Sequence, residues 1–413
     1  MLKADIKIKK FCAAALLDEG IFLQKILRQV IINKPFFRDE IFGIKFALAI
    51  KITESKSHKG VFCMNNIKVI VWGLGAMGGG MARMILQKKG MEIVGAIASR
   101  QEKAGRDLGE VLNLGTKVGV TVTAESEKAL KEDADIVLVA TSSFTREVFP
   151  QIKMAVESGK NVITIAEEMA YPAYREPDIA KEIDKLAKDH NVTVLGTGIN
   201  PGFVLDTLII ALSGVCMDIK KITARRINDL SPFGTTVMRT QGVGTTVEEF
   251  HRGLEEGTIV GHIGFPESIS LISESLGLEI DEIKQIREPI VSKVYRETPY
   301  AKVQPGMVAG CKHIGIGLRK GEPVIILEHP QQIRPELENV ETGDYIEIEG
   351  TPNIDLAIKP EIPGGIGTIA IAVNMIPKVI EAKPGLVTMK DLPVPAAIMG
   401  DVRKLLKDGG ENA

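Results

Sequence analysis

Residues 67–78 read IKVIVWGLGAMG, and this stretch decides the fold of the chain. Residues 67–72 are rich in β-branched side chains, which is typical of a strand, and a G-x-G-x-x-G loop follows that opens a helix expected over 77–89. Gly73 permits the tight turn, Gly75 lets the backbone approach a pyrophosphate, and Gly78 lets helix and strand pack closely. A glycine-rich turn in an unrelated α/β protein is the alternative, but the strand before the loop and the helix after it favour dinucleotide binding. The residues expected to hold the cofactor are Gly73, Gly75, Ala76, Met77 and Gly78.

The chain that follows this loop alternates strands and helices. Apolar strands are expected over 92–98, 135–140, 160–166 and 192–196, with helices over 144–157 and 177–189. Strands that alternate with helices form βαβ units and a parallel sheet. The sequence therefore predicts an α/β fold, a Rossmann doubly wound parallel sheet, over residues 64–205.

After residue 206 the pattern changes to longer strands in which polar and apolar residues alternate. Such strands are expected over 220–228, 288–296, 308–319, 323–328, 344–349 and 353–358, with helices over 246–256 and 267–276. This mixture predicts an α+β domain over 206–363 that binds substrate and mediates oligomerisation. An apolar helix with glycines at its front, 364–382, begins a last segment, 364–413, that we expect to pack back on the first domain.

The composition argues against several classes of protein. The 51 basic residues nearly balance 53 acidic ones, so no basic excess indicates nucleic acid or an anionic membrane as a partner. The longest apolar runs are too short to cross a bilayer, which needs about 20 residues. The 4 cysteines are scattered, which argues against a disulfide framework and a structural zinc site. We therefore expect a cytoplasmic protein with a small-molecule substrate, and the apolar α+β domain favours a homodimer or homotetramer.

Residues 1–63 differ from the rest of the chain. They are mildly basic and rich in Lys, Ile and Phe, and Met64 stands just before the first clear strand. We interpret this segment as an extension that is not native, with Met64 as the natural start. The alternative is a small helical arm used in oligomer contacts.

Two further strand ends bear on the choice of cofactor. An acid at the end of the second strand would bind the 2′-hydroxyl of NAD, but Ser99 stands there, and Arg100 beside it can accept the 2′-phosphate of NADP. This favours NADP, or the use of both NAD and NADP, unless Arg100 is only a solvated charge. Thr141 and Ser142 follow the strand 135–140, so we expect them to flank the nicotinamide ribose; capping of the next helix by Ser142 or Ser143 is a second reading.

The next two strand ends carry candidates for chemistry. Glu167 and Glu168 follow the strand 160–166, where carboxylates can bind a cationic substrate or act as a base, or remain solvated loop charges. Asn200 lies in the loop 197–203, TGINPGF, whose glycines and Asn-Pro pair indicate a specified shape, and its side chain offers both a donor and an acceptor. We assign Glu168 and Asn200 to catalysis and Glu167 to substrate binding.

Arginines and histidines beyond residue 206 complete the candidate site. An arginine can clamp a carboxylate with two hydrogen bonds, and Arg225 and Arg239 are the choices from a set that also contains Arg226. His262 lies between glycines in GHIG and is preferred over His313 for acid–base catalysis, although single histidines are more often structural. The 6 histidines include no closely spaced pair, so we expect no metal site.

Several motifs together resemble the 2,4-diaminopentanoate dehydrogenases. They are VIVWGLGAMGGGMAR, ATSS, ITIAEEMAYP, GTGINPGFVLD and PGLVTMKDLPVP, and the resemblance runs from Met64 to the C-terminus. This family belongs to a wider group that shares a dihydrodipicolinate-reductase-like nucleotide-binding domain. The reductases' His-His-x-x-Lys segment is missing here, because the chain has no adjacent histidine pair. Their catalytic residues are therefore not carried over.

The resemblance implies NAD(P)-dependent oxidative deamination of 2,4-diaminopentanoate at C4, which yields 2-amino-4-oxopentanoate and ammonia in ornithine fermentation. Hydride leaves the carbon that bears an amine, so this amine must first be neutral and a base is needed. A substrate with two ammonium groups and one carboxylate requires acidic residues near the amines and an arginine near the carboxylate. Glu168, Asp206 and Asp229 fit the first role, and Arg225 or Arg239 fits the second.

Two alternatives stay open from the sequence. The scaffold also suits another amino-acid dehydrogenase or an imine reductase, because fold does not fix substrate. A non-catalytic nicotinamide-sensing module would need a segment that binds DNA or a partner protein, which only residues 1–63 could supply.

Overall fold

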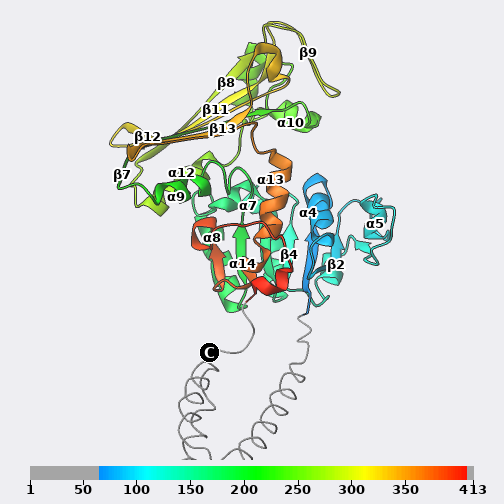
Figure 1. The fold of residues 1–413 in the computed structure, drawn as a ribbon. Helices are drawn as coiled ribbons and strands as arrows, with labels where there is room; N and C mark the ends of the chain where they lie inside the picture. The colour runs from blue at the N-terminus through cyan, green and yellow to red at the C-terminus, as the bar shows by residue number, and fades with distance from the viewer. Residues whose placement is uncertain (1–64, 407–413) are drawn as a thin grey trace, which may run out of the picture. The chain divides into compact units, whose positions relative to one another are not determined.

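The computed structural model describes residues 65–406 of the chain, and its first layer is an all-parallel sheet. The sheet has seven strands in the order β15-β6-β5-β4-β1-β2-β3 (Figure 1). Their bounds are Ile67–Trp72 (β1), Met91–Ile97 (β2), Val122–Thr123 (β3), Ile136–Val139 (β4), Asn161–Thr164 (β5), Thr193–Gly196 (β6) and Gly385–Val387 (β15). Because all strands are parallel, their carboxyl ends share one edge of the sheet.

Helices cover both faces of this sheet, and each face has its own apolar core. Val69 and Val71 of β1 pack on one face, whereas Ile70 and Trp72 pack on the other. This is why the strand reads as a continuous apolar run without alternation. The helices of this layer are α4 (Ala76–Leu86), α5 (Leu108–Val111), α6 (Ser126–Ala129), α7 (Thr145–Glu157), the 3₁₀ helix η1 (Glu167–Ala170) and α8 (Pro177–Asp189). The predicted doubly wound fold is confirmed.

The second sheet has six strands in the order β14-β13-β7-β12-β11-β8, and only β7 and β12 run parallel to each other. Two helices, α9 and α12, pack on one of its faces and bury an apolar core there. The strands are Asp218–Asp229 (β7), Glu282–Val291 (β8), Val308–Arg319 (β11), Glu322–Gln332 (β12), Gly343–Thr351 (β13) and Ile354–Ile358 (β14), and the helices are Thr207–Ser213 (α9) and Phe265–Leu276 (α12).

Shorter elements complete this second layer. The strand expected over 288–296 is divided, because β8 ends at Val291 and a separate hairpin follows. The remaining elements are α10 (Thr235–Thr240), α11 (Val247–Glu255), β9 (Arg296–Glu297), β10 (Lys302–Val303) and the 3₁₀ helix η2 (Pro335–Glu338). The expected mixture of strands and helices after residue 206 is therefore present.

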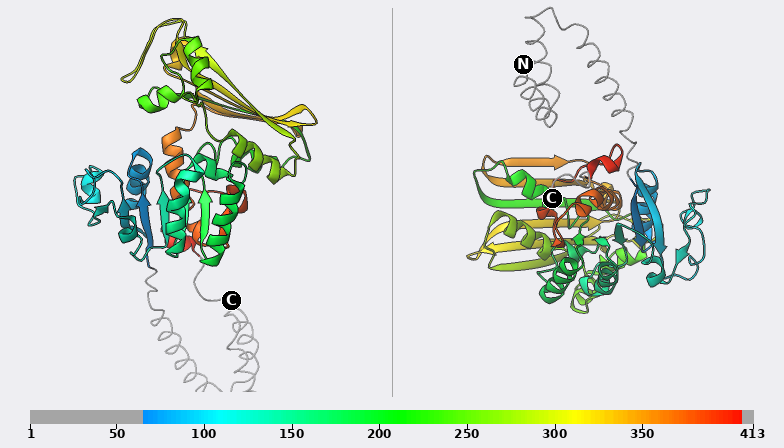
Figure 2. Two further views of the ribbon diagram at one scale, coloured as in Figure 1. Left: turned by 180° about the vertical axis from the view of Figure 1, so that it is seen from behind. Right: turned by 90° about the horizontal axis from the view of Figure 1, so that it is seen from below.

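The C-terminal segment returns to the parallel sheet. Helix α13 (Gly364–Asn374) lies along α4, where Ile369 packs closely against Gly80 (Figures 1 and 2). The expected helix 364–382 is divided, since α14 (Ile376–Ile380) starts anew just before a proline. Strand β15 then pairs with β6 at the sheet edge, which the sequence analysis did not predict. The chain ends in the 3₁₀ helices η3 (Met389–Asp391) and η4 (Val402–Leu405).

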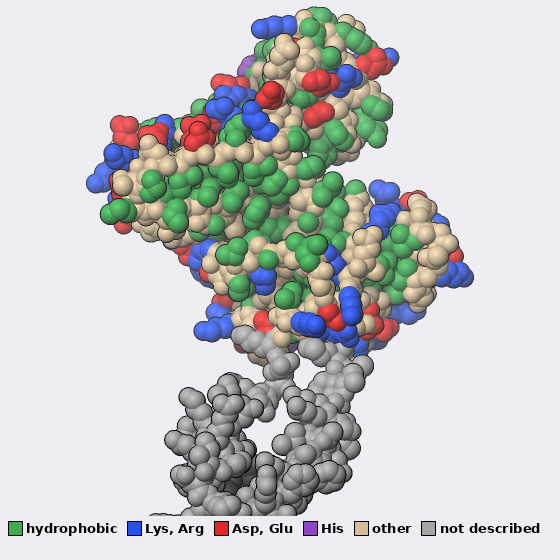
Figure 3. Space-filling view, in the orientation of Figure 1, with side chains coloured by type: hydrophobic (Ala, Val, Ile, Leu, Met, Phe, Trp, Pro, Cys, Tyr) green, Lys and Arg blue, Asp and Glu red, His purple; other side chains and the backbone are tan. Residues whose placement is uncertain are grey.

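Charged and hydrophobic side chains occupy different parts of the surface. Acidic and basic side chains are interspersed along the rim of the six-stranded sheet, and hydrophobic side chains gather below that rim (Figure 3). Within residues 65–406, none of the helices is long and apolar enough to span a membrane. The proposals for Met64 as natural start and for a non-native segment 1–63 lie outside the described residues.

Candidate active site

The glycine loop between β1 and α4 has the backbone that a dinucleotide site requires. Gly73 has a φ of 101°, and a Cβ there would lie 2.4 Å from the carbonyl oxygen of Ala140. A Cβ at Gly78 would lie 1.7 Å from the carbonyl oxygen of Gly73. These two glycines therefore allow β1, α4 and the end of β4 to approach one another, as expected.

Gly75 differs from these two glycines because a Cβ there would meet nothing within 4 Å. It is the N-cap of α4, where no side chain caps the helix and no acid lies in the first turn. The N–H groups and the positive dipole end of α4 are thus open to an anion. Ala76 is exposed beside Gly75, and Met77 packs against Gly365 of α13. The residues present therefore fit the pyrophosphate of a nicotinamide dinucleotide.

The other predicted cofactor residues lie at the same sheet edge. Ser99 and Arg100 follow β2 and are exposed, and Arg100 has a weak ion pair of 3.7 Å with the exposed Glu102. Thr141 and Ser142 follow β4, which lies next to β1, and they bond to Gln151 and Glu147 of α7. Ser142 also accepts a hydrogen bond from the N–H of Phe144. Phe144, however, is the N-cap residue of α7 and makes no side-chain capping bond. The second reading, in which Ser142 or Ser143 caps this helix, is therefore wrong.

The β2 loop supplies one cation that the sequence analysis missed. Nζ of Lys103 donates a hydrogen bond of 2.6 Å to the carbonyl oxygen of Leu74 in the glycine loop. This lysine is a further positive charge beside the phosphate-binding loop. Only the position of its side chain in the folded structure reveals it, because lysines in loops are common.

The two glutamates after β5 have different surroundings. Oε2 of Glu168 accepts a hydrogen bond of 2.9 Å from the N–H of Thr145, and Oε1 lies 3.4 Å from Nε of Arg175. Glu168 is buried, and these two contacts fix its carboxylate at the N-terminus of α7. Burial raises the pKa of the Glu167 carboxyl, and a hydrogen bond with Ser143 opposes this rise. Glu167, assigned above to substrate binding, thus fits the part of a base better than Glu168, assigned above to catalysis.

A chain of polar side chains links the loop after β6 to the six-stranded sheet. Nδ2 of Asn200 lies 3.3 Å from Nδ1 of His329, and Nε2 of His329 lies 2.9 Å from Oδ1 of Asn228. Since Oδ1 can only accept, Nε2 of His329 carries its proton, and Nδ1 then accepts from Asn200. Oδ1 of Asn200 is left buried without a hydrogen-bond partner within the described chain. Asn200 can therefore offer a carbonyl oxygen to a donor group on a ligand.

Two more histidines lie beside this chain, and both are neutral at neutral pH. The His262 ring lies 4.9 Å from the His329 ring, and its Nε2 has no hydrogen-bond partner in residues 65–406. Burial, together with the charge of Arg226, lowers the pKa of His262 to about 3. Burial lowers the pKa of His313, which accepts from the N–H of His262, to about 2. The predicted acid–base role of His262 therefore does not fit these surroundings, although a neutral imidazole can still hydrogen-bond a ligand.

Neighbouring arginines of β7 point to opposite faces of the sheet. Arg226 is 2% exposed, lies 2.6 Å from Asp344 and donates to the carbonyl oxygen of Ile362. Arg225, predicted to bind the carboxylate, lies on the other face, is 44% exposed at its side chain and pairs with Glu328. The other choice, Arg239, is exposed on α10. The buried position thus makes Arg226 the better candidate.

Asp206 is buried, but it serves the fold. It is the N-cap of α9 and accepts from the N–H of Thr207, the N–H of Gly202 and the hydroxyl of Ser268. Burial raises the pKa of this carboxyl, and its hydrogen bonds oppose the rise. Because these donors already surround both oxygens, Asp206 is poorly placed to bind an ammonium group and instead shapes the loop that carries Asn200.

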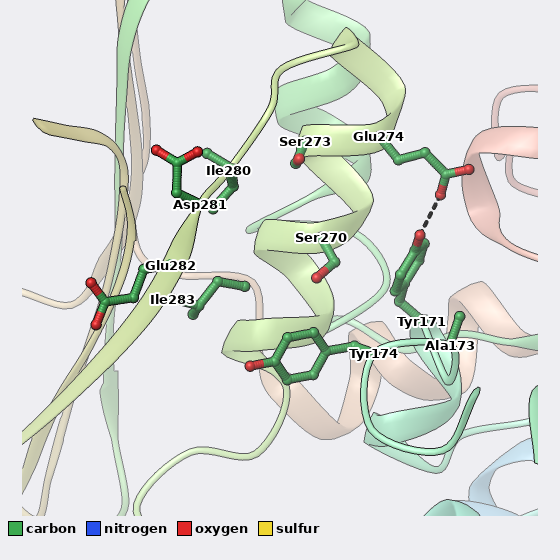
Figure 4. Close-up of a pocket in the computed structure, with 10 residues that line it drawn as sticks. All are labelled: Tyr171, Ala173, Tyr174, Ser270, Ser273, Glu274, Ile280, Asp281, Glu282 and Ile283. Carbon is green, nitrogen blue, oxygen red and sulfur yellow. Dashed lines mark hydrogen bonds between the residues drawn. The ribbon is translucent and has the colours of Figure 1, made fainter. Parts of the chain in front are cut away.

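One cavity of about 510 Å³ lies away from these groups, between α12, the segment 171–174 that follows η1 and the segment 280–283 that leads into β8 (Figure 4). Tyr171 and Glu274 face each other across one end of it and share a hydrogen bond of 2.6 Å. None of the candidate site residues lines this cavity. We therefore place the candidate active site beside the buried polar groups described above, at the edge of the parallel sheet that carries the cofactor residues, and not in this cavity.

Comparisons with known proteins match these two layers. Residues 67–166 match the family model for the N-terminus of dihydrodipicolinate reductase, and residues 203–408 match that for the C-terminal domain of 2,4-diaminopentanoate dehydrogenase. A 2,4-diaminopentanoate dehydrogenase of Acetoanaerobium sticklandii is 52% identical over 348 residues, which cover 84% of this chain and 98% of that protein. The chain belongs to the 2,4-diaminopentanoate dehydrogenase family.

More distant relatives include amine dehydrogenases. One from Streptomyces virginiae is 26% identical over 80% of this chain and 98% of its own length. The solved structure of an amine dehydrogenase from Mycobacterium smegmatis superposes with a TM-score of 0.72 and 30% identity, and covers 80% of this chain and 97% of that one. The predictions of a dehydrogenase and of this family are confirmed.

In this member of the 2,4-diaminopentanoate dehydrogenase family, sequence reasoning missed some residues that the structure brings together. His329 contacts the predicted Asn200 and is itself bonded to Asn228, while Arg175 contacts the predicted Glu168. A signal for Arg226 did exist, because Ile222 and Ala224 precede it at alternate positions and predict that Arg226 shares their buried face. No signal in the sequence pointed to His329, since it lies more than 120 residues from Asn200 along the chain.

Proposed function

We propose that this chain catalyses the NAD(P)-dependent oxidative deamination of 2,4-diaminopentanoate at C4, with 2-amino-4-oxopentanoate and ammonia as products. The observation that carries the proposal is the half-buried carboxyl of Glu167 on η1, just beyond β5 at the sheet edge that carries the cofactor residues, where partial burial raises its pKa. A carboxylate with a raised pKa is a better proton acceptor than an ordinary glutamate, and an ammonium substrate requires such an acceptor. We propose that this reaction serves ornithine degradation.

In this mechanism Glu167 is the residue that accepts and donates protons. Ionised Glu167 takes a proton from the C4 ammonium group, so that a neutral amine is formed. A bound nicotinamide dinucleotide would supply the acceptor for the hydride that leaves C4, and loss of this hydride converts the neutral amine to an iminium ion. Glu167 then loses its proton to solvent and, ionised again, takes a proton from the water that adds to C4. It returns this proton to the nitrogen as the C4–N bond breaks, and the remaining hydroxyl proton leaves with ammonia as ammonium, so that the ketone forms. One water is consumed for each ammonia released.

The rest of the substrate would be recognised by the polar face beside β7. Arg226 uses two of its N–H groups on Asp344 and Ile362, so that donors remain for the substrate carboxylate. The free Oδ1 of Asn200 accepts from an ammonium group of the substrate. A diamino acid satisfies both preferences, because it carries a carboxylate and a second amine.

For the cofactor, we propose that the enzyme accepts NADP as well as NAD. Ser99 and Arg100 place no carboxylate where the 2′-hydroxyl of NAD would be bound, and Lys103 adds a cation beside the glycine loop. Glu102 is the nearest acid and is exposed. Repulsion between Glu102 and a 2′-phosphate is therefore screened by solvent.

A second candidate function is amine dehydrogenase activity on simple monoamines, and the similarity to two amine dehydrogenases favours it. The buried Arg226 argues for a carboxylate on the substrate, because its N–H groups beyond those bonded to Asp344 and Ile362 would have no acceptor on a monoamine. Comparison of 2,4-diaminopentanoate with 2-aminopentane as substrates separates the two functions.

Product analysis tests the proposal. The purified enzyme is incubated with 2,4-diaminopentanoate and NAD or NADP, and the ketone is trapped with a hydrazine and identified by mass spectrometry. Oxidation at C4 leaves an α-amino acid with a ketone in the side chain. An α-keto acid would show that the amine at C2 reacts, which would contradict the proposed orientation.

A further inference from the structure

Arg175 lies between two buried carboxylates that belong to different layers of the fold. Its Nε lies 3.4 Å from Oε1 of Glu168 and 2.8 Å from Oε1 of Glu267. Glu168 belongs to η1, the short helix after β5 that also begins with Glu167. Glu267 lies in the first turn of α12, which packs on the six-stranded sheet. One guanidinium thus joins the cofactor-binding layer to the substrate-binding layer.

The contact of Arg175 with Glu267 has a large electrostatic effect, because Glu267 is completely buried. Its side chain is 0% exposed, and its Oε2 has no hydrogen-bond partner among residues 65–406. Burial raises the pKa of Glu267, and the charge of Arg175 opposes that rise. A buried carboxylate whose cation is removed becomes much costlier to ionise. The positive charge of Arg175 therefore lowers the cost of ionising Glu267 in its buried position.

A second contact fastens the same segment to the same helix. The hydroxyl of Tyr171 donates a hydrogen bond of 2.6 Å to Oε2 of Glu274, which lies two helical turns beyond Glu267 on α12 (Figure 4). Glu168 itself caps the N-terminus of α7 through the N–H of Thr145. The short segment around Glu167 is thus held from two helices at once.

We propose that Arg175 is a positioning residue which, by bridging Glu168 and Glu267, holds the segment that carries Glu167 against helix α12. This inference rests on the proposed function of Glu167 as the base. Arg175 itself does not touch the reacting atoms in this account. It sets the distance between the base on the cofactor-binding layer and the substrate held by the six-stranded sheet.

The charges around this bridge come from several elements. Glu167 and Glu168 lie on η1, Arg146 faces Glu168 from α7, and Glu267 comes from α12. Burial lowers the pKa of Arg287 of β8, and repulsion by Arg175 lowers it further. Arg287 donates to the carbonyl oxygen of Val260 and Arg146 pairs with Glu176, so neither is placed to replace Arg175.

The test compares Arg175→Gln, Arg175→Lys and Arg175→Gln/Glu267→Gln in the full chain, with Arg146→Gln as the control. Arg146 pairs with Glu176 near the same segment, but its side chain is 76% exposed. We expect Arg175→Gln to lower kcat for the diamine about tenfold, the effect of one lost hydrogen bond to a charged group, with the affinity for NADH unchanged. Arg175→Lys and the double variant should recover most of kcat, and Arg146→Gln should match the wild type.

A measurement without substrate separates this inference from the proposed function. The raised pKa of Glu267 means that its contribution to stability is present at low pH and is lost as pH rises through the folded-state pKa. Arg175→Gln raises that pKa further, so its melting temperature should fall below that of the wild type by several degrees more at pH 8 than at pH 5. In the double variant this extra gap should disappear.

Three results would overturn the inference: a wild-type kcat in Arg175→Gln, an equal loss of kcat in Arg146→Gln, or a gap in melting temperature that does not change with pH. If Arg175→Gln does not fold, failure of both Arg175→Lys and the double variant to recover kcat would overturn it too. If the wild type does not oxidise the diamine, the proposed function fails, and the pH dependence of melting still decides whether Arg175 balances the two carboxylates.

Discussion

Asn200 and His329 meet through Nδ2 and Nδ1 at 3.3 Å, and this contact decides which end of the Asn200 amide is free. The amide could otherwise rotate by half a turn and present its NH₂ group instead. Because Asn228 accepts from Nε2 of His329, the histidine must accept from Asn200. The buried site thus presents a carbonyl oxygen, which suits an ammonium group.

Replacement of His329 should disturb substrate binding more than cofactor binding. We expect His329→Leu to lower kcat/KM for the diamine by about 10- to 100-fold, since a buried polar group left without its partner costs about 1–3 kcal/mol. The affinity for NADH, measured by quenching of its fluorescence, should stay the same. His190→Ala is the control, because His190 is exposed after α8. An unchanged kcat/KM in His329→Leu would remove Asn200 from the substrate site.

The two glutamates after β5 should respond differently to amidation. Glu167→Gln should lower kcat by about 10²- to 10⁴-fold, the usual effect of losing a general base, without loss of folding. Glu168→Gln should lower the melting temperature as well as kcat, because it weakens the contact with Arg175. Thermal unfolding and steady-state kinetics on both variants check this. Turnover of Glu167→Gln at the wild-type rate would exclude Glu167 as the base.

The pH dependence of the wild type follows from the same carboxyl. Burial raises the pKa of Glu167, and the base must be ionised to accept a proton. The value of kcat/KM should therefore fall as pH decreases through this raised pKa, at a higher pH than an ordinary glutamate would give. The acid limb should vanish from the residual activity of Glu167→Gln. Persistence of the same limb in that variant would assign it to another group.

Two glycines of the cofactor loop offer a matched pair of substitutions. Gly78→Ala should prevent correct folding, because its Cβ would lie 1.7 Å from the carbonyl oxygen of Gly73. Gly75→Ala should keep the wild-type melting temperature, since nothing lies within 4 Å of its Cβ position, but it should weaken cofactor binding. Thermal unfolding and NADH titration distinguish the two effects. If Gly75→Ala bound NADH as tightly as the wild type, the pyrophosphate would not lie against this loop.

The pair of Arg226 and Asp344 should matter for stability. Both residues are at most 2% exposed, and Asp344→Asn would leave a buried guanidinium without its counter-charge. We expect this change to lower the free energy of unfolding by about 3 kcal/mol, as measured by urea denaturation. Glu341→Gln, which breaks the exposed pair with Lys359, should leave the midpoint unchanged. Equal midpoints for all three proteins would show that the buried pair is not a structural requirement.

Local patterns were enough to predict the fold class. The glycine loop and the apolar strands around it follow from short-range rules, and the parallel sheet follows from their alternation with helices. Strand β15 escaped prediction because three residues carry no periodicity, and because its partner β6 lies nearly 200 residues earlier. Pairing over such a separation is determined by packing and not by local sequence.

The site was harder to predict because side-chain direction and tertiary partners decide it. Arg225 and Arg226 are adjacent in β7, and only the alternation of the strand places one outside and the other inside. Glu168 looked as suitable as Glu167 until its contacts with Thr145 and Arg175 were visible. Asn200 was predicted from the specified shape of its loop, but its partner His329 could not be inferred from spacing.

The initial rate of nicotinamide reduction with 2,4-diaminopentanoate is the most direct test of the proposed oxidative deamination. Absorbance at the wavelength of reduced nicotinamide is followed with NAD and NADP separately, and ornithine, 2,6-diaminopimelate and 2-aminopentane serve as comparison substrates. We expect rapid reduction of the nicotinamide with 2,4-diaminopentanoate and little with the other amines. Clear cofactor binding without reduction by 2,4-diaminopentanoate, or faster reduction with 2-aminopentane, would contradict it.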